Sequence, residues 1–195
     1  PAFVLPVFQW SMYVGVLSAF HFMEFISTAI WQPKDLCYNS FIVNHSPSYT
    51  IAALASWTEY VLGSTVYPQY KHNSFFMCVG FTVVLLGQVV RTVSMSTCGS
   101  NFSHIIMHDK TSENPDHQLV TTGIYSYLRH PSYFGWFYWS IGTQILLCNP
   151  ICTLAYAWAS WSFFLNRIPV EERSLVRFYG GQYVEYGRRT YIGIP

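Results

Sequence analysis

The fold is decided by the stretch Gly123-Ile124-Tyr125-Ser126-Tyr127-Leu128-Arg129-His130-Pro131-Ser132-Tyr133-Phe134-Gly135, where a polar segment gives way to an apolar one. Apolar residues then dominate as far as Leu165, apart from Cys148-Asn149-Pro150, whose Asn-Pro pair is a turn signal. Charge returns in the stretch 167–173. The pattern predicts an antiparallel hairpin of two short membrane helices, residues 132–147 and 151–165, whose polar ends meet on one side of a bilayer.

The composition of the whole chain is that of a membrane protein. Charged residues make up 10%, against roughly 25% in soluble domains. Hydrophobic residues reach 51% and aromatic residues 19%, which suits membrane-interface belts of Tyr and Trp. We interpret residues 1–195 as a single all-α domain of a polytopic integral membrane protein; a globular enzyme with an aromatic core is the alternative. The net charge of +1 leaves no basic stripe, which excludes nucleic acid as a partner.

Apolar runs predict five transmembrane helices, since one span needs about 20 apolar residues or fewer in a tight hairpin. Three of these runs carry ionisable residues, namely Glu24, Glu59 and Arg91. We expect the two carboxylates to be structural, either paired with His21 or Arg91 or lying nearer to an interface. The five predicted spans are residues 3–30, 49–67, 75–95, 132–147 and 151–165.

The distribution of positive charge predicts the orientation of these spans. Lysines and arginines concentrate in residues 91–129 and 167–189, two regions that the hairpin separates, so we place both on the cytosolic side. The Asn149 turn is then lumenal. Lys34 falls on the cytosolic side and Lys71 on the lumenal side, so the rule holds only approximately.

The segment 170–191 mixes apolar and charged residues, so we predict an interfacial C-terminal helix on the cytosolic face. Gly180-Gly181 should interrupt it.

Cysteine and histidine patterns give no metal site. His104 and His108 are the one pair at ligand-like spacing, and no third ligand lies near them in the sequence. The cysteines have no CxxC spacing and mostly lie in or beside apolar runs, so we expect buried free thiols. They are Cys37, Cys78, Cys98, Cys148 and Cys152.

Two groups of residues at the polar ends of the hairpin are candidates for chemistry. Arg129 and His130 precede Pro131, a favoured first helical residue, and a helix start offers unpaired N–H groups to an anionic or hydrogen-bonding ligand. Ordinary anchoring at the membrane interface is an equal alternative. Arg167 and Glu171 share one helical face, so they could pair with each other, or Arg167 could bind a carboxylate.

The motifs Gly123-x-Tyr125-x-x-x-Arg129-His130-Pro131-Ser132-Tyr133-x-Gly135 and Arg167-x-x-x-Glu171-Glu172 resemble those of the isoprenylcysteine carboxyl methyltransferases. The resemblance to the animal enzymes extends through residues 99–104, 119–121, 135–144 and 147–150. Phospholipid methyltransferases and sterol reductases carry related patterns, and the longer agreement selects the prenylcysteine family. Animal members have more spans, which implies further membrane helices before Pro1.

The resemblance implies S-adenosylmethionine as methyl donor and a multi-pass protein of the endoplasmic reticulum membrane whose active site faces the cytosol. It implies as acceptor the C-terminal carboxylate of a prenylated cysteine on CaaX-processed proteins such as small GTPases. Arg167 matches the family's arginine for that carboxylate. The implied donor site comprises His117, Gln118, Leu119, Val120, Tyr125, His130, Pro131, Ser132, Tyr133 and Glu171.

Chemistry adds two expectations to the resemblance. A C-terminal carboxylate is already ionised at pH 7, so methyl transfer needs no general base. The site has only to align the reacting atoms and to exclude water. The alternatives from other classes are an NADPH-dependent membrane sterol reductase or a phospholipid methyltransferase, and a non-catalytic scaffold or transport protein.

Overall fold

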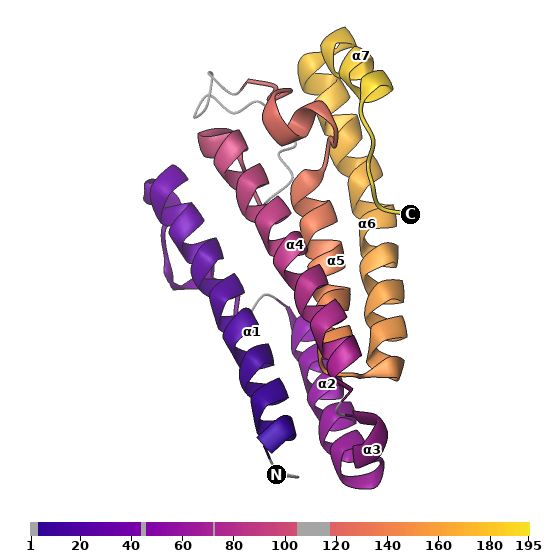
Figure 1. Cartoon of the computed structure of the whole chain (residues 1–195). Helices are drawn as coiled ribbons and strands as arrows, with labels where there is room; N and C mark the ends of the chain where they lie inside the picture. The colour runs from indigo at the N-terminus through magenta and orange to yellow at the C-terminus, as the bar shows by residue number, and fades with distance from the viewer. Residues whose placement is uncertain (1–3, 44–45, 72, 105–117) are drawn as a thin grey trace.

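The computed structural model describes residues 4–43, 46–71, 73–104 and 118–195, and these are almost entirely helical (Figure 1). Within these ranges no strand occurs, and one isolated bridge joins Leu128 to Tyr191. The predicted all-α class is therefore confirmed. The α-helices are α1 (Val4–Trp31), α2 (Pro47–Val66), α3 (Pro68–Lys71), α4 (Ser74–Cys98), α5 (Pro131–Leu146), α6 (Pro150–Tyr179) and α7 (Gly181–Arg189).

Local sequence explains where these helices begin and end. Proline occupies the first helical position of α2, α5 and α6, where its missing N–H costs nothing. Ser46 Oγ accepts a hydrogen bond from Tyr49 N, at 3.2 Å, and so caps α2. Helix α6 ends at Gly180, which has a φ of 56°, and α7 starts directly after it. The predicted interruption at Gly180-Gly181 is confirmed.

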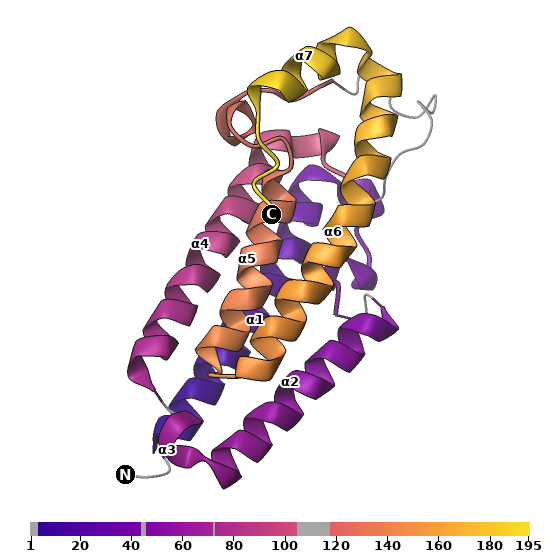
Figure 2. The ribbon, with the colours of Figure 1, turned by 90° about the vertical axis from the view of Figure 1, so that its right-hand side faces the viewer.

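The helices alternate in direction, so the polar segments 99–104, 118–130 and 167–190 all lie at one end of the bundle, and the last residues of the chain return from there toward its middle (Figure 1). The short turn between α5 and α6 lies at the opposite end, beside α3 (Figure 2). We call these the polar end and the turn end. The hairpin does bring the two polar ends together, as predicted.

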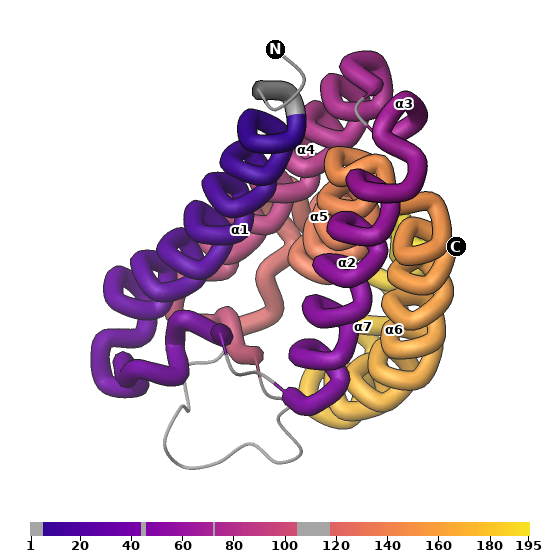
Figure 3. Tube along the Cα trace, turned by 90° about the horizontal axis from the view of Figure 1, so that it is seen from below, coloured from indigo at the N-terminus to yellow at the C-terminus, as the bar shows by residue number. Residues whose placement is uncertain are grey.

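The closest packing in the bundle is between α4 and α5, where glycines allow the two backbones to touch. A Cβ on Gly87 would lie 2.7 Å from the Gly135 carbonyl oxygen, and a Cβ on Gly135 would lie 2.6 Å from the Gly87 carbonyl oxygen. Neither position has room for a side chain. Small residues that bring backbones together are typical of helix pairs in membranes. Helices α1 and α6 flank this pair on opposite sides (Figure 3).

Helix α6 is much longer than the predicted fifth span. The prediction ended that span at Leu165 because charge returns there, but the helix continues through Pro169 to Tyr179. Pro169 removes only one backbone donor, and Glu172 beyond it binds Arg129 and His130 before and at the start of α5, so the helix does not stop. At about 1.5 Å per residue, 30 residues extend about 45 Å, well beyond a hydrocarbon core of about 30 Å.

Polarity in the bundle is reversed relative to a water-soluble protein. On α1 the outward side chains include Val7, 63% exposed, and Phe22, 57% exposed, while Gln9 and Glu24 are buried. Extended exposed apolar surface of this kind indicates a membrane or a partner. Among the described residues, two helical segments are long and apolar enough to cross a membrane, Pro6–Trp31 and Ser74–Asn101. The other three predicted spans and the orientation remain predictions.

The turn end contains a buried polar network that includes Lys71, the residue that departs from the positive-charge rule used to predict orientation. Its ammonium group donates to the Cys148 carbonyl at 3.1 Å and to Asn149 Oδ1. Asn149 Nδ2 in turn donates to the Ser56 carbonyl at 2.9 Å. Because its ammonium group is hydrogen-bonded inside the protein, Lys71 carries little information about which side of the membrane this end faces.

All five cysteines are free, but the prediction that they are buried is wrong for Cys37 and Cys78, which are exposed. Cys152 alone is fully buried. The apolar run that contains Cys78 forms an outward helix face, which sequence hydrophobicity cannot distinguish from a core face.

Candidate functional site

The polar end gathers side chains from α4, from the segment before α5, and from α6 and α7. In Figure 2, α7 turns back across this end of the bundle toward the segment that precedes α5. The C-terminal residues then return alongside that segment, with Tyr191 N donating to the Tyr127 carbonyl and Arg129 N donating to the Tyr191 carbonyl. The two halves of the predicted motif are therefore held against one another.

Arg129 is a structural anchor at this end. Its Nε lies 2.5 Å from Glu172 Oε1, and its Nη1 donates to the Thr190 carbonyl at 2.6 Å. The sequence left open whether Arg129 binds a ligand or lies in the membrane interface. In the structure its side-chain N–H groups connect the segment before α5 to α6 and to the segment after α7.

His130 connects both glutamates of the motif. Its Nε2 lies 3.2 Å from Glu172 Oε1 and its Nδ1 lies 3.9 Å from Glu171 Oε2. Burial opposes ionisation of Glu172, but hydrogen bonds from His130 and Arg129 outweigh it and lower the pKa of Glu172 to about 2. Glu172 is therefore ionised, and its Oε1 atom is held by both Arg129 and His130.

Glu171 differs from its neighbour, because its Oε2 atom is buried and has no hydrogen-bond partner among the described residues. Buried carboxylate oxygens without a partner are rare, and each needs an explanation such as a ligand. An ammonium or hydroxyl group of a bound molecule would satisfy it. Of the two adjacent carboxylates, Glu171 is the one with a buried oxygen that no described donor satisfies.

Arg167 lies one helical turn before Glu171 but does not pair with it in the described structure. Its Nε donates to the Tyr133 hydroxyl at 2.8 Å, and its Nη2 donates to the His104 carbonyl at 2.6 Å. The guanidinium also lies over the rings of Tyr133 and Phe163, at 5.5 Å and 5.7 Å. These groups are uncharged, so the described residues provide no anion to neutralise Arg167.

A buried ion pair between α1 and α4 contacts the first turn of α5. Glu24 on α1 binds Arg91 on α4 through both carboxylate oxygens, and Arg91 Nη1 donates to Ser132 Oγ at 3.0 Å. Of the alternatives expected for Glu24, the structure shows pairing with Arg91. Pro131 and Ser132 are buried, and the His130 ring stacks on the Tyr133 ring at a centroid distance of 5.5 Å.

Two tyrosines complete this region. Tyr125 lies in the 3-10 turn Gly123–Ser126, and its carbonyl accepts a hydrogen bond from the Tyr186 hydroxyl at 2.8 Å. Burial raises the pKa of Tyr125, so its hydroxyl stays protonated. Tyr183 on α7 is 4% exposed, and its hydroxyl has no partner among the described residues. Tyr183 belongs to the segment predicted as an interfacial helix, and no feature of the sequence indicated its unpaired hydroxyl.

The remaining predicted donor residues are less closely tied to this group. Gln118 is exposed and its backbone N donates to Asn101 Oδ1 at 3.2 Å, while Leu119 and Val120 are half-buried. His117 lies outside the described residues, as does His108. The structure thus brings together His130, Pro131, Ser132, Tyr133, Arg167 and Glu171, and it records no contact between this group and Gln118, Leu119 or Val120.

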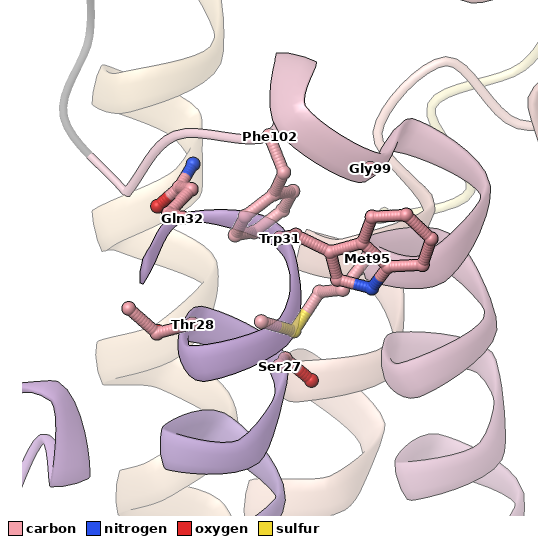
Figure 4. A pocket seen from close by; sticks show the side chains of 7 residues that line it. All are labelled: Ser27, Thr28, Trp31, Gln32, Met95, Gly99 and Phe102. Atoms are coloured by element: carbon pink, nitrogen blue, oxygen red, sulfur yellow. The ribbon is translucent and has the colours of Figure 1, made fainter. Parts of the chain in front are cut away.

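A separate small pocket, partly open to the surroundings, lies between the end of α1 and the segment that follows α4 (Figure 4). None of its lining residues belongs to the predicted donor site, and most of its wall is apolar or weakly polar. Among the described residues no group of three His, Cys, Asp or Glu side chains could hold a metal ion. The pocket is lined by Ser27, Thr28, Trp31, Gln32, Met95, Gly99 and Phe102.

Comparisons with known proteins agree with this architecture. Residues 78–177 match the model of the isoprenylcysteine carboxyl methyltransferase (ICMT) family. A solved structure described as the eukaryotic intramembrane Ras methyltransferase ICMT superposes with a TM-score of 0.94 at 45% identity, covering 100% of this chain and 69% of that one. The chain therefore belongs to the isoprenylcysteine carboxyl methyltransferase family.

Its relatives include named enzymes from distant eukaryotes. The protein-S-isoprenylcysteine O-methyltransferase of Xenopus laevis is 49% identical and that of Homo sapiens 46% identical, each over 188 residues, or 96% of this chain. The chain spans 64% of the length of each of these two proteins. The Saccharomyces cerevisiae protein of the same name is 40% identical over 193 residues, and the chain covers 80% of it.

Proposed function

We propose that this protein transfers a methyl group from S-adenosylmethionine to the C-terminal carboxylate of a prenylated cysteine and forms a methyl ester. Family membership and the names of the relatives support the reaction class. The observation that carries the proposal is the pair Arg167 and Glu171. One turn of α6 presents a cation that no described carboxylate neutralises and a buried carboxylate oxygen that no described donor satisfies.

We assign the polar end of the methyl donor to Glu171 and to the first turn of α5. The unpartnered Glu171 Oε2 fits an ammonium or a ribose hydroxyl group, and the start of α5 offers unpaired N–H groups. Tyr125, His130, Pro131, Ser132 and Tyr133 complete the proposed pocket on this side, and His117, Gln118, Leu119 and Val120 form its other wall. S-adenosylmethionine, when bound, supplies an electrophilic methyl group on its sulfonium.

Arg167 binds and orients the acceptor carboxylate in this proposal. The carboxylate is ionised at neutral pH, so no residue of this chain has to remove a proton from it. Tyr133 and the His104 carbonyl hold two donors of the guanidinium, which fixes its plane while leaving its charge unneutralised. An arginine so held aligns the nucleophile at low entropic cost, and the surrounding rings exclude water.

The acceptor side of the reaction requires a membrane, because a prenyl chain belongs in hydrocarbon. Outward apolar surface on α1, α2 and α4, together with glycine-mediated packing of α4 on α5, supports a bilayer-embedded bundle. We place the polar end at the cytosolic face of the endoplasmic reticulum membrane, with α7 as the interfacial helix. Prenylated CaaX proteins such as small GTPases are the proposed acceptors.

The test is transfer of a radiolabelled methyl group from S-adenosylmethionine to a farnesylcysteine analogue by the full-length protein in lipid nanodiscs. We expect label in the prenylcysteine fraction that mild base releases as methanol, which is the signature of a carboxyl methyl ester. Base-stable label, or transfer to phospholipid instead, would contradict the proposal. A rise in the thermal unfolding midpoint with S-adenosylhomocysteine but not with NADPH would distinguish this protein from a sterol reductase.

A further inference from the structure

Glu24 is a buried charge for which the proposed reaction has no direct use. It lies on the inner face of α1 and is 1% exposed. Burying a carboxylate is costly unless charge and hydrogen bonds compensate it. Arg91 supplies one compensating charge through a two-point contact, and the ring of His104 lies 3.6 Å from Glu24 Oε2. The carboxylate therefore holds two elements at once, α4 and the segment that follows it.

His104 is the point where this network reaches the site. Its ring faces Glu24, while its main-chain carbonyl accepts the hydrogen bond from Arg167 Nη2 at 2.6 Å. Ring and carbonyl belong to one residue in a stretch without regular secondary structure, so a contact that holds the ring restrains the main chain that carries the carbonyl. The guanidinium of Arg167 has only one other hydrogen bond recorded among the described residues, to Tyr133.

We propose that Glu24 is a positioning residue for Arg167, acting by holding the ring of His104 so that the His104 carbonyl fixes the guanidinium. Glu24 does not touch the acceptor. This inference rests on the proposed role of Arg167 in binding the acceptor carboxylate. It predicts that loss of the Glu24 charge changes acceptor recognition more than donor binding, although Glu24 lies on a helix that carries none of the predicted site residues.

The test uses Glu24→Gln, His104→Ala and the double variant of the full-length protein in nanodiscs, with Glu59→Gln as the matched control. Glu59 is also a carboxylate within the bundle, but it accepts from the backbone N–H groups of Ile151 and Cys152 at the turn end. Two quantities are measured for each variant, the KM for a farnesylcysteine analogue and the Kd for S-adenosylhomocysteine.

Each single variant should raise the acceptor KM by about tenfold, because even a small displacement of a group that orients a substrate weakens its productive binding. The Kd for S-adenosylhomocysteine should stay within about twofold of the wild-type value. The double variant should be no worse than the single ones, because both changes break one connection. Glu59→Gln should lower thermal stability without changing the KM.

An unchanged KM in His104→Ala would overturn the inference, and so would additive effects in the double variant. His104 has a partly exposed side chain, so its variant decides the question even if Glu24→Gln does not fold. A wild-type protein that transfers no methyl group would overturn the proposed function, and this inference with it. Wild-type transfer with an unchanged KM in the variants overturns the inference alone.

Discussion

The two ends of the bundle use similar residues and differ in how completely those residues are paired. At the turn end, Lys71 donates to the Cys148 carbonyl and to Asn149, and Glu59 accepts from the N–H groups of Ile151 at 2.9 Å and Cys152 at 2.6 Å. The buried Lys71 and the half-buried Glu59 bind protein groups that begin or end helices. They hold α2, α3 and the α5–α6 turn together.

At the polar end, pairing is complete for some groups and incomplete for others. Arg129, His130 and Glu172 bind one another, whereas Glu171 Oε2 and the Tyr183 hydroxyl have no partner among the described residues. Neutral atoms without a partner also occur elsewhere among the described residues, at Ser64 Oγ near the turn end and at Gln88 Oε1 and Trp139 Nε1 within the bundle. Glu171 Oε2 is the one carboxylate oxygen in this set, and a buried carboxylate oxygen without a donor indicates where a ligand binds.

Replacing Arg167 with Ala should have the largest effect of any single change at the polar end. Loss of one ion pair with the acceptor in a desolvated site costs about 2–5 kcal/mol, which corresponds to a fall of roughly 30-fold to 5,000-fold in kcat/KM. Binding of S-adenosylhomocysteine, measured by calorimetry, should remain. Near-normal turnover in this variant would remove Arg167 from the reaction.

Glu171→Gln should weaken donor binding, and Glu172→Gln serves as its matched control one residue away. Hydrogen bonds to charged groups contribute about 1.5–3 kcal/mol, so the Kd for S-adenosylhomocysteine should rise by roughly 10-fold to 150-fold in the first variant. The second variant should lose thermal stability instead. If the two variants exchanged these effects, the assignment of the open acceptor to Glu171 would be wrong.

At the turn end, Asn149→Ala should lower stability without touching catalysis. The substitution removes one of the two recorded acceptors of the Lys71 ammonium group and the side-chain donor to the Ser56 carbonyl, at a cost of about 1–3 kcal/mol. The midpoint of thermal unfolding should fall, while the KM values for donor and acceptor in the folded protein should not change. A selective loss of acceptor binding would mean that the turn end communicates with the site.

The Glu172 ion pair should make stability depend on acidic pH. Its pKa is about 2 in the folded protein, against an ordinary value of 4.5, so its stabilisation is complete above pH 4.5 and is lost as pH falls toward 2. The difference in unfolding midpoint between wild type and Glu172→Gln should therefore shrink across that window. A difference that stays constant from pH 6 down to about pH 2.5 would exclude this ion pair as its source.

Neither metal chelation nor mildly alkaline pH should change the rate of methyl transfer. Because no metal site is expected and the acceptor carboxylate is ionised well below neutrality, the transfer rate should survive EDTA and vary little between about pH 7 and pH 8. A steep rise through that interval with unchanged binding would implicate a histidine such as His130 as a base.

Much of this architecture could be predicted from the sequence because it depends on local signals. Apolar runs located the five long helices within a few residues, apart from the end of α6. Gly180-Gly181 marked the break before α7, and Asn149-Pro150 marked the turn. The hairpin then required residues 123–135 and 167–173 to meet. The pairing of Glu24 with Arg91 could also be anticipated, because few countercharges exist within the apolar runs.

The rest depends on contacts between distant residues, which a single sequence does not reveal. Nothing local distinguishes Glu171 from Glu172, yet Glu172 Oε1 is hydrogen-bonded to Arg129 and His130 while Glu171 Oε2 has no described donor. Charge after Leu165 resembled the end of a helix, whereas in the structure Arg167 binds Tyr133 and the His104 carbonyl. The backbone contact between Gly87 and Gly135 likewise needs both helices in place.

The most direct test of the difference between the two ends is an experimental structure with S-adenosylhomocysteine bound in nanodiscs. We predict that a hydroxyl or ammonium group of the ligand lies within hydrogen-bonding distance of Glu171 Oε2, while Glu172 remains on Arg129 and His130 and the turn-end network is unchanged. A ligand held by Glu172 instead, or one that occupies the pocket beside Trp31 and leaves Glu171 unpaired, would contradict the account.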